Sequence, residues 1–284
     1  FPSTTLFRSN IMGRITRTAE SVIGEGGKLL IPYFVAGDPD LVTTLQLMHT
    51  VVDKGADIIE LGIPFSDPSS DGPVIQRSVE RSLQRNTSLD DVLELVRQFR
   101  EKNDNTPIVL MGYLNPIEIM GYRKFAVRAS LVGIDGVLVV DMPPAESAEL
   151  HTLLRDAGVE TIYLVSPTTS ESRARHITAL CSGYLYYVSL KGVTGAVLSD
   201  YHSVKENLTR LRNLTDLPIV IGFGIKDQQS VKALGRLADG VIIGSALVNK
   251  IAELPHTSVQ AQDDINECTN LIGVARKEIG RAHV

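Results

Sequence analysis

Several features that would mark a particular class of protein are scarce or missing in this chain of 284 residues. Tryptophan is absent, and the two cysteines, Cys181 and Cys268, form neither a CxxC pair nor a disulfide framework. The six histidines include no HxxxH or HxH pair, which argues against a metal site. No apolar run approaches the ~20 residues that a membrane-spanning helix requires.

An excess of positive charge is missing too. The 28 Lys and Arg residues are outnumbered by 33 Asp and Glu residues, so the net charge is -5, which argues against a nucleic-acid-binding protein. The hydrophobic content of 43% and the charged content of 21% exclude disorder as the main state. Because thiols are few and no secretion signal is found, we expect a cytoplasmic globular protein.

The two ends of the chain follow neither a helical nor a strand period. Residues 1–9 (FPSTTLFRS) and 278–284 (EIGRAHV) resemble translated adapter sequence and are interpreted as non-native flanks. Frayed native termini are the alternative. The rest, residues 10–277, shows no linker and no break in composition, and is predicted to form one domain.

Short apolar runs alternate with helical stretches throughout this domain. The runs are rich in Val, Ile and Tyr and nearly continuous, as in parallel strands buried on both faces. They span residues 29–36, 56–62, 107–113, 136–141, 161–166, 184–189, 218–224 and 240–244. Helices are predicted between them over residues 40–54, 89–102, 118–132, 144–157, 170–181, 203–215 and 228–237.

Eight such units in one run predict a (β/α)8 TIM barrel, with an extra helix before it (12–23) and another after it (263–277). A doubly wound open sheet is the alternative. It would have fewer strands and a glycine-rich turn after the first strand, where this chain has AGDPD.

In a barrel the loops after the strands build the active site. Glu60 interrupts an otherwise apolar second strand, and Asp67 and Asp71 follow on a loop rich in Pro, Gly and Ser. Burial would raise the pKa of Glu60 and make it a proton donor and acceptor near neutral pH. The alternative is a solvent-exposed strand end followed by two turn aspartates.

The loops after the last three strands are rich in glycine. Residues 189–195 (SLKGVTG) could form a mobile lid, while GFG (222–224) and GSA (244–246) could bind a phosphate through backbone N–H groups. Tight turns are the alternative for each. No lysine lies within a strand, because Lys191 is in the glycine-rich loop and Lys28 precedes the first strand, so a Schiff-base mechanism is disfavoured. These residues indicate a phosphorylated substrate and acid–base chemistry by carboxylates.

In chain order, these loops resemble the motifs of the tryptophan synthase alpha subunit family. The most specific motif, ELGIPFSDPxxDGPxIQ, spans Glu60–Gln76. The other matches are PYFVAGDP (32–39), YLNP (113–116), DMPP (141–144), GVTG (192–195), GFGI (222–225) and GSA (244–246). The resemblance extends from about residue 12 to residue 277.

The resemblance implies a lyase of L-tryptophan biosynthesis that cleaves indole-3-glycerol phosphate to indole and glyceraldehyde 3-phosphate by a retro-aldol reaction. Glu60 stands at the position of the general acid/base, which protonates indole C3 and helps to remove the glyceryl hydroxyl proton. Asp71 stands at the position of the carboxylate that accepts the indole N–H. Because the C3-protonated indole is the electron sink, no cofactor and no metal are expected in this chain.

The resemblance implies three further groups of residues. The substrate-binding positions are Tyr33, Tyr113, Tyr186, Thr194 and Phe223. The phosphate-binding positions are Gly195, Gly224, Gly244 and Ser245. The partner is the beta subunit, a pyridoxal-phosphate enzyme, in an alpha2beta2 heterotetramer, and the interface positions are Pro64, Asp67, Asp141 and Pro143.

Some positions depart from the family pattern, namely Ser69–Ser70, Leu190–Lys191 and Ala145, and none of them is catalytic. Two alternatives to an alpha subunit stay open. The chain could be a stand-alone indole-3-glycerol-phosphate lyase, or a non-catalytic allosteric partner of the beta subunit. The presence of both Glu60 and Asp71 weighs against the second alternative.

Overall fold

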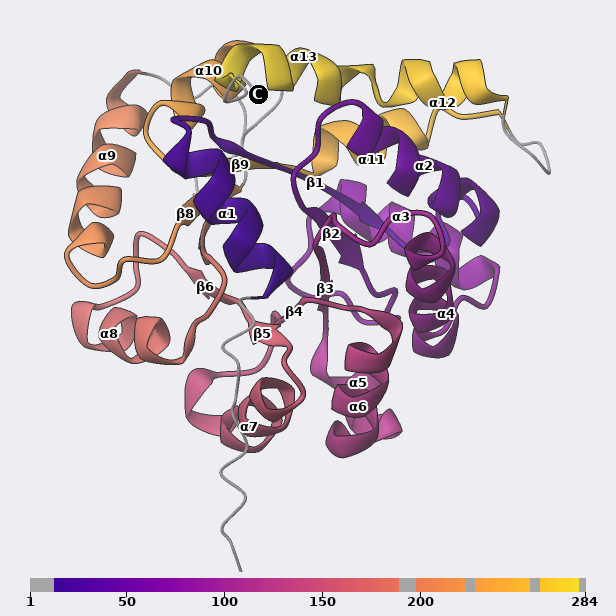
Figure 1. Ribbon diagram of the computed structural model, residues 1–284, viewed down its shortest axis with the longest axis horizontal. Helices are drawn as coiled ribbons and strands as arrows, with labels where there is room; N and C mark the ends of the chain where they lie inside the picture. Colours follow the sequence, from indigo (N-terminus) through magenta and orange to yellow (C-terminus); the bar gives the residue numbers. More distant parts are fainter. Residues whose placement is uncertain (1–12, 189–197, 223–227, 256–260, 281–284) are drawn as a thin grey trace, which may run out of the picture.

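Short parallel strands form a ring at the centre of the computed structural model, which describes residues 13–188, 198–222, 228–255 and 261–280 (Figure 1). Hydrogen bonds join the strands in the order β5-β4-β3-β2-β1-β9-β8-β7-β6. The strands are β1 (Leu29–Val35), β2 (Ile59–Gly62), β3 (Ile108–Gly112), β4 (Gly136–Val139), β5 (Glu160–Thr161), β6 (Tyr163–Val165), β7 (Leu185–Val188), β8 (Ile219–Gly222) and β9 (Gly240–Ile243).

The ring closes through the predicted fifth strand. That run is divided at Ile162 into β5, which pairs with β4, and β6, which pairs with β7. Because a single residue separates β5 from β6, the two edges of the sheet meet in one short segment of chain. The predicted (β/α)8 TIM barrel is therefore confirmed, and the open doubly wound sheet is excluded.

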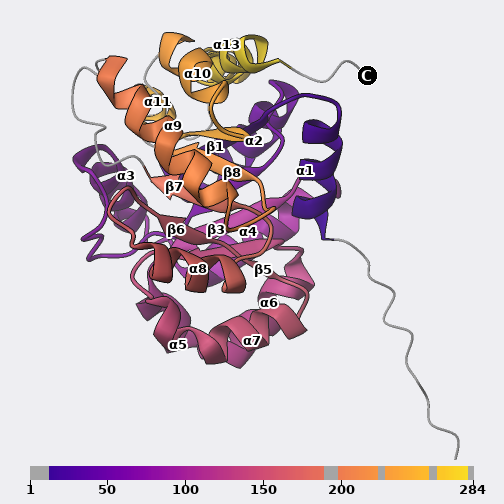
Figure 2. The same cartoon turned by 90° about the vertical axis from the view of Figure 1, so that its left-hand side faces the viewer.

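Helices surround the ring on its outside, except α1, which lies across one end (Figures 1 and 2). They are α1 (Arg14–Gly24), α2 (Leu41–Asp53), α3 (Pro73–Gln84), α4 (Leu89–Arg100), α5 (Leu114–Met120), α6 (Tyr122–Val132), the 3-10 turn η1 (Pro144–Glu146), α7 (Ala148–Asp156), α8 (Glu171–Leu180), α9 (Leu198–Arg212), α10 (Gln228–Gly235), α11 (Ser245–Ile251), α12 (Gln262–Cys268) and α13 (Asn270–Ile279).

The helices differ from the sequence prediction in several places. The predicted helix 144–157 is divided into η1 and α7, and the predicted helix 203–215 is α9, which begins and ends earlier. The predicted helix 118–132 is two helices, α5 and α6, because Gly121 between them has a φ of 87°, outside the helical region. The predicted C-terminal helix is likewise divided, at Thr269. Helix α3 was not predicted. Its buried face combines Ile75 and Val79 with Ser78 and Ser82, so its apolar period is weak.

Helix α1 covers the amino-terminal end of the barrel. Its Ile15 is fully buried and packs beside Gly136, the first residue of β4. Figure 2 places α1 at one end of the strands and α3, which follows the loop after β2, at the other. The carboxyl ends of the strands, with the loops after β2 and β3, therefore lie opposite α1. Among the described residues, no helix has the length and apolar character needed to span a bilayer.

Candidate active site

Glu60 lies in the middle of the barrel wall, in β2. Its side chain is 0% exposed, and burial raises its pKa to about 8. The Tyr184 hydroxyl donates a hydrogen bond to Oε1 at 3.1 Å, while Oε2 has no hydrogen-bond partner among the described residues. An unpaired buried carboxyl group is costly to ionise. Glu60 is therefore held as a neutral acid at neutral pH, with one oxygen free for another partner.

The sequence analysis did not identify Tyr184, which directly precedes β7. Side chains in a strand alternate between its two faces, so Tyr184 and Tyr186 share one face, whereas Tyr187 is on the other. The pKa of Tyr186 is raised well above its usual value by burial, then by the charges of Glu60 and Asp71, so Tyr186 faces the interior of the barrel. This period of two, applied to the run YLYYVS, could have placed Tyr184 beside Glu60.

Asp71 lies on the loop after β2 and is partly buried. The Tyr113 hydroxyl donates to Asp71 Oδ2 at 3.1 Å and accepts from the Ser70 N–H at 3.0 Å. The Phe65 ring packs on Tyr113 with 5.4 Å between the centroids. Burial raises the pKa of Asp71, and the Tyr113 hydrogen bond opposes that rise. The loop thus holds this carboxylate against the phenol at the end of β3.

Tyr33 lies in β1, directly beside Glu60 in the register of β1 and β2. Its pKa is raised well above the usual value by burial and then by the charges of Asp71 and Glu60. A Cβ atom at Gly62 would lie 2.6 Å from the Tyr33 hydroxyl, and one at Gly244 would lie 3.4 Å from its ring. Gly62 therefore leaves the room that the phenol occupies.

A cavity of about 480 Å³ opens at this end of the barrel. Its volume is within the range of small-molecule sites. Asp71 and Tyr186 line it, whereas Glu60, which is fully buried, is not part of its wall. The remaining lining residues are Ser70, Met111, Val140, Leu164, Val165, Ser166, Thr168, Thr169, Arg173 and Val188.

Comparisons with known proteins identify the family. A sequence profile described as "Tryptophan synthase alpha chain" matches residues 20–277. The chain belongs to this family. It is 54% identical over 242 residues to the tryptophan synthase alpha chain of Thioalkalivibrio sulfidiphilus, a match that covers 85% of this chain and 91% of that protein.

Solved structures of tryptophan synthase alpha chains have the same fold as this chain. The tryptophan synthase alpha subunit of Legionella pneumophila superposes with a TM-score of 0.87 at 42% identity, covering 94% of this chain and 98% of that one. A chain from the tryptophan synthase α2β2 complex of Pyrococcus furiosus superposes with a TM-score of 0.78 at 35% identity, covering 88% and 99%. The family predicted from the sequence motifs is thus confirmed.

The predicted phosphate positions of this tryptophan synthase alpha chain are described in part. Gly244 directly follows β9 and is half-buried, and Ser245 is exposed as the first residue of α11. Gly195 and Gly224, together with Thr194 and Phe223, lie outside the described residues.

Of the predicted interface residues, Asp67, Asp141 and Pro143 are exposed, whereas Pro64 is buried within the chain. Asp141 Oδ1 accepts a hydrogen bond from the Leu114 N–H at 2.8 Å, which ties the loop after β4 to the start of α5. The described residues contain no group of three or more His, Cys, Asp or Glu side chains placed to hold a metal ion.

Proposed function

We propose that Glu60 and Asp71 divide the acid–base chemistry by which this tryptophan synthase alpha chain cleaves indole-3-glycerol phosphate to indole and glyceraldehyde 3-phosphate. The observation that carries the proposal is the environment of Glu60. Its carboxyl group is fully buried, has a pKa of about 8 and keeps one oxygen without a described partner. A general acid/base is most effective when its pKa lies near the working pH.

The proposed cycle begins with protonated Glu60. Its proton is transferred to indole C3, which turns the ring into an electron sink. The bond between C3 and the glyceryl carbon then breaks, and the Glu60 carboxylate takes the proton of the neighbouring hydroxyl group as the aldehyde forms. Indole has gained one hydrogen at C3, the aldehyde has lost one from oxygen, and Glu60 is protonated again.

Asp71 acts as an anion in this proposal. Protonation at C3 places positive charge on the indole nitrogen, and an ionised carboxylate that accepts the N–H stabilises that charge. Asp71 is less buried than Glu60 and receives the Tyr113 hydrogen bond, which favours its charged form. Two carboxyl groups in unlike environments can therefore hold opposite protonation states at one pH.

The substrate is proposed to lie between these carboxyl groups and the loops after β7, β8 and β9. Its phosphate would bind at Gly195, Gly224, Gly244 and Ser245, its indole and glyceryl parts would contact Tyr33, Tyr113, Tyr186 and Phe223, and Thr194 would belong to a closing lid. These assignments come from the family motifs. The convergence of Tyr33 and Tyr186 on both carboxyl groups supports the part of the site that is described.

The beta subunit is the proposed partner, in an alpha2beta2 assembly like that of the Pyrococcus furiosus relative. Pyridoxal phosphate would belong to that subunit, and the alpha chain itself would need no cofactor. Asp67, Asp141 and Pro143 would contribute exposed contacts, while Pro64 would support their loop from beneath. The start of α5 is bonded to Asp141, and Ile119 on that helix is 82% exposed, an apolar side chain available to the same interface.

We also propose that residues 10–277 form a single barrel domain with non-native flanks at 1–9 and 278–284, and that the protein is cytoplasmic. At the second boundary the helix α13 extends to Ile279, so any flank would begin within its last turn.

Indole release by the purified chain, with and without a beta subunit, tests the proposal. An alpha subunit should release indole slowly alone and much faster with beta. Full activity without beta would identify a stand-alone lyase, and no activity in either state would identify a non-catalytic partner. Glu60→Gln should abolish cleavage, and if it retained full activity the acid/base assignment would be wrong.

A further inference from the structure

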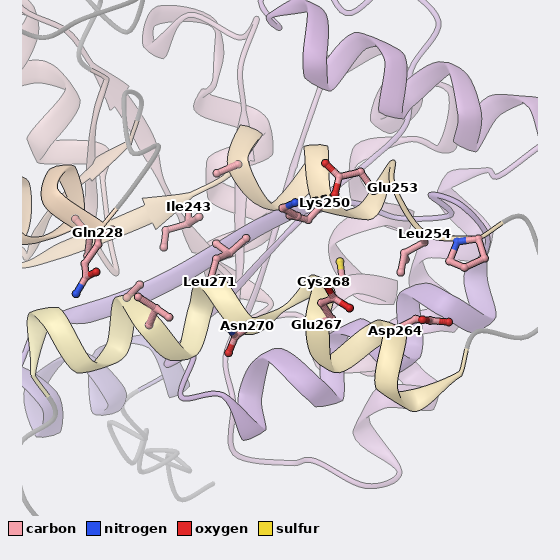
Figure 3. A pocket seen from close by; sticks show the side chains of 15 residues that line it. Gln228, Ile243, Lys250, Glu253, Leu254, Asp264, Glu267, Cys268, Asn270 and Leu271 are labelled. Atoms are coloured by element: carbon pink, nitrogen blue, oxygen red, sulfur yellow. Dashed lines mark hydrogen bonds and ion pairs between the residues drawn. The ribbon is translucent and has the colours of Figure 1, made fainter.

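A second cavity, of about 630 Å³, lies outside the ring of strands, between α11 on one side and α12 and α13 on the other (Figure 3). We call it the α11–α12 cavity. Its described lining contains none of the residues given a role in the reaction. Aliphatic side chains make up much of its wall, namely Val231, Ile243, Leu254, Leu271 and Val274. In volume and in apolar lining it resembles a small-molecule site.

The charged side chains of this cavity are mostly acidic. Glu253, Asp264 and Glu267 line it together with one cation, Lys250. The ammonium group of Lys250 lies 2.7 Å from Glu253 Oε2, so it neutralises that carboxylate first. Asp264 and Glu267 have no ion-pair or hydrogen-bond partner among the described residues. The charge of Glu267, an exposed residue, also acts on Lys250, whereas Asp264 is half-buried. The cavity therefore combines an apolar wall with three carboxylates and one ammonium group.

Cys268 provides an independent sign of an unfilled polar contact. Its side chain is 4% exposed and free, and the thiol has no hydrogen-bond partner among the described residues. Figure 3 shows its sulfur directed from α12 into the space below α11. Burial and then the charge of Glu253 raise the pKa of this thiol to about 12, consistent with a negative environment.

We propose that the α11–α12 cavity is a binding site for an amphipathic organic cation, which is a primary amine or guanidinium group attached to an apolar body. The apolar body would pack on Leu271 and Val274, beside the Cys268 thiol. The cationic group would lie between Asp264 and Glu267, in a wall where three carboxylates are accompanied by one ammonium group. A neutral ligand of the same shape would gain no attraction from these carboxylates, and an anionic one would be repelled.

Occupancy of this cavity should also be felt at the reaction site. Ile243 and Ala246 line the cavity, and the two residues between them, Gly244 and Ser245, are the proposed phosphate-binding turn. A ligand behind this turn packs on the same short segment that would hold the substrate phosphate. We therefore expect the ligand to change KM for indole-3-glycerol phosphate and leave kcat unchanged, a consequence that rests on the proposed function.

Binding is tested by calorimetric titration of the full chain, without substrate, with 4-phenylbutylamine and with 4-phenylbutanol as its neutral counterpart. The amine should bind at least about tenfold more tightly, equivalent to about 1.4 kcal/mol. The double variant Asp264→Asn/Glu267→Gln should lose this preference. Asp263→Asn, an exposed carboxylate of the same helix outside the lining, should keep it. Equal binding of the two probes, or an unchanged preference in the double variant, would overturn the proposal.

Leu271→Trp locates the site, because the larger side chain fills the cavity. This variant should no longer bind the amine. In the wild type the amine should change KM at least about twofold, and in Leu271→Trp it should leave KM unchanged. Amine binding that survives Leu271→Trp refutes the location, and a constant KM in wild type refutes the coupling. A chain that cleaves no substrate at all would contradict the proposed function, while the calorimetric result would still decide the binding site. Melting temperatures verify that every variant is folded.

Discussion

Replacing Tyr184 with Phe removes the hydroxyl group that donates to Glu60 and changes little else, because both rings fill the same buried space. The donor lies 3.1 Å from Glu60 Oε1 and favours the ionised carboxylate. A hydrogen bond to a charged group contributes about 1.5–3 kcal/mol, which corresponds to about 1 to 2 pKa units. The variant should therefore raise the pKa of Glu60 from about 8 to well above it.

The assay is the pH dependence of kcat/KM for indole release. If protonated Glu60 begins the cycle, activity of the wild type falls with rising pH through an apparent pKa of about 8. In Tyr184→Phe this alkaline limb should move upward by about 1 to 2 pH units. A purely structural role for Tyr184 would lower activity at all pH values and leave the limb in place.

Tyr187→Phe is the matched control, because it removes the same atom from a tyrosine three residues further along the chain, in β7. The Tyr187 hydroxyl is buried without a hydrogen-bond partner among the described residues, and Arg210 on α9 is the charge that acts on it. This variant should leave the alkaline limb unchanged. An unchanged limb in Tyr184→Phe, or an equal displacement in both variants, would refute the assignment of this limb to Glu60.

Three further predictions concern the same site. Glu60→Gln should stabilise the protein increasingly between pH 4.5 and 8. In this range the Glu60 carboxyl group ionises in the unfolded state, whereas its folded pKa of about 8 keeps it protonated, so the wild type loses at most about 5 kcal/mol of stability. Urea unfolding at pH 4 and pH 9 measures this, and equal stability gains at both pH values would contradict it. Asp71→Asn should lower kcat by about a hundredfold or more, and it should also lower the pKa of Tyr113 from about 12. Single-turnover kinetics test the first effect and ultraviolet titration of tyrosine the second, and Asp67→Asn in the same loop should produce neither when the chain is assayed alone. Gly62→Ala should impair kcat/KM by forcing the Tyr33 hydroxyl aside, and Gly62→Ala/Tyr33→Phe should recover part of the loss; a double variant worse than the single would show that the two sites do not compete for space.

Most of the barrel was predictable because its signals are local. Each strand is a short apolar run, and the strand β1, with all seven residues buried, is the extreme case. Features that depend on tertiary contacts were not predictable. Helix α3 was missed because two serines lie on its buried face, and there Ser82 donates to the carbonyl oxygen of Ala36. The division of the fifth strand at Ile162 follows from ring closure, which no local pattern records.

The site was predictable to a similar extent. Glu60 was recognisable as a carboxylate inside an apolar strand, and Asp71 as part of the same motif. That Tyr113 holds Asp71, and that Tyr184 holds Glu60, depends on which strand ends meet across the barrel. The role expected for Tyr113 was substrate binding, and its hydrogen bond to Asp71 gives it a second task in positioning that carboxylate.

Other buried carboxylates of the chain are paired with arginine, whereas Glu60 has a tyrosine as its partner. Three aspartates in the described residues are buried in ion pairs with guanidinium groups. These pairs are Asp38–Arg81, Asp57–Arg276 and Asp135–Arg100. An arginine beside Glu60 would favour its ionised form and remove the proton that the cycle requires.

Glu160 shows that a raised pKa alone does not make a catalytic group. Burial raises its pKa to about 7, and Thr16 on α1 donates to its Oε1 at 2.9 Å. It thus shares with Glu60 a hydroxyl partner and the lack of a described ion pair. Glu160, however, begins β5 beneath α1, at the amino-terminal end of the barrel, whereas Asp71 and its cavity lie at the carboxyl end. The chemistry assigned to Glu60 therefore depends on both conditions together, a carboxyl group kept neutral and a second, ionised carboxylate at the same end of the strands.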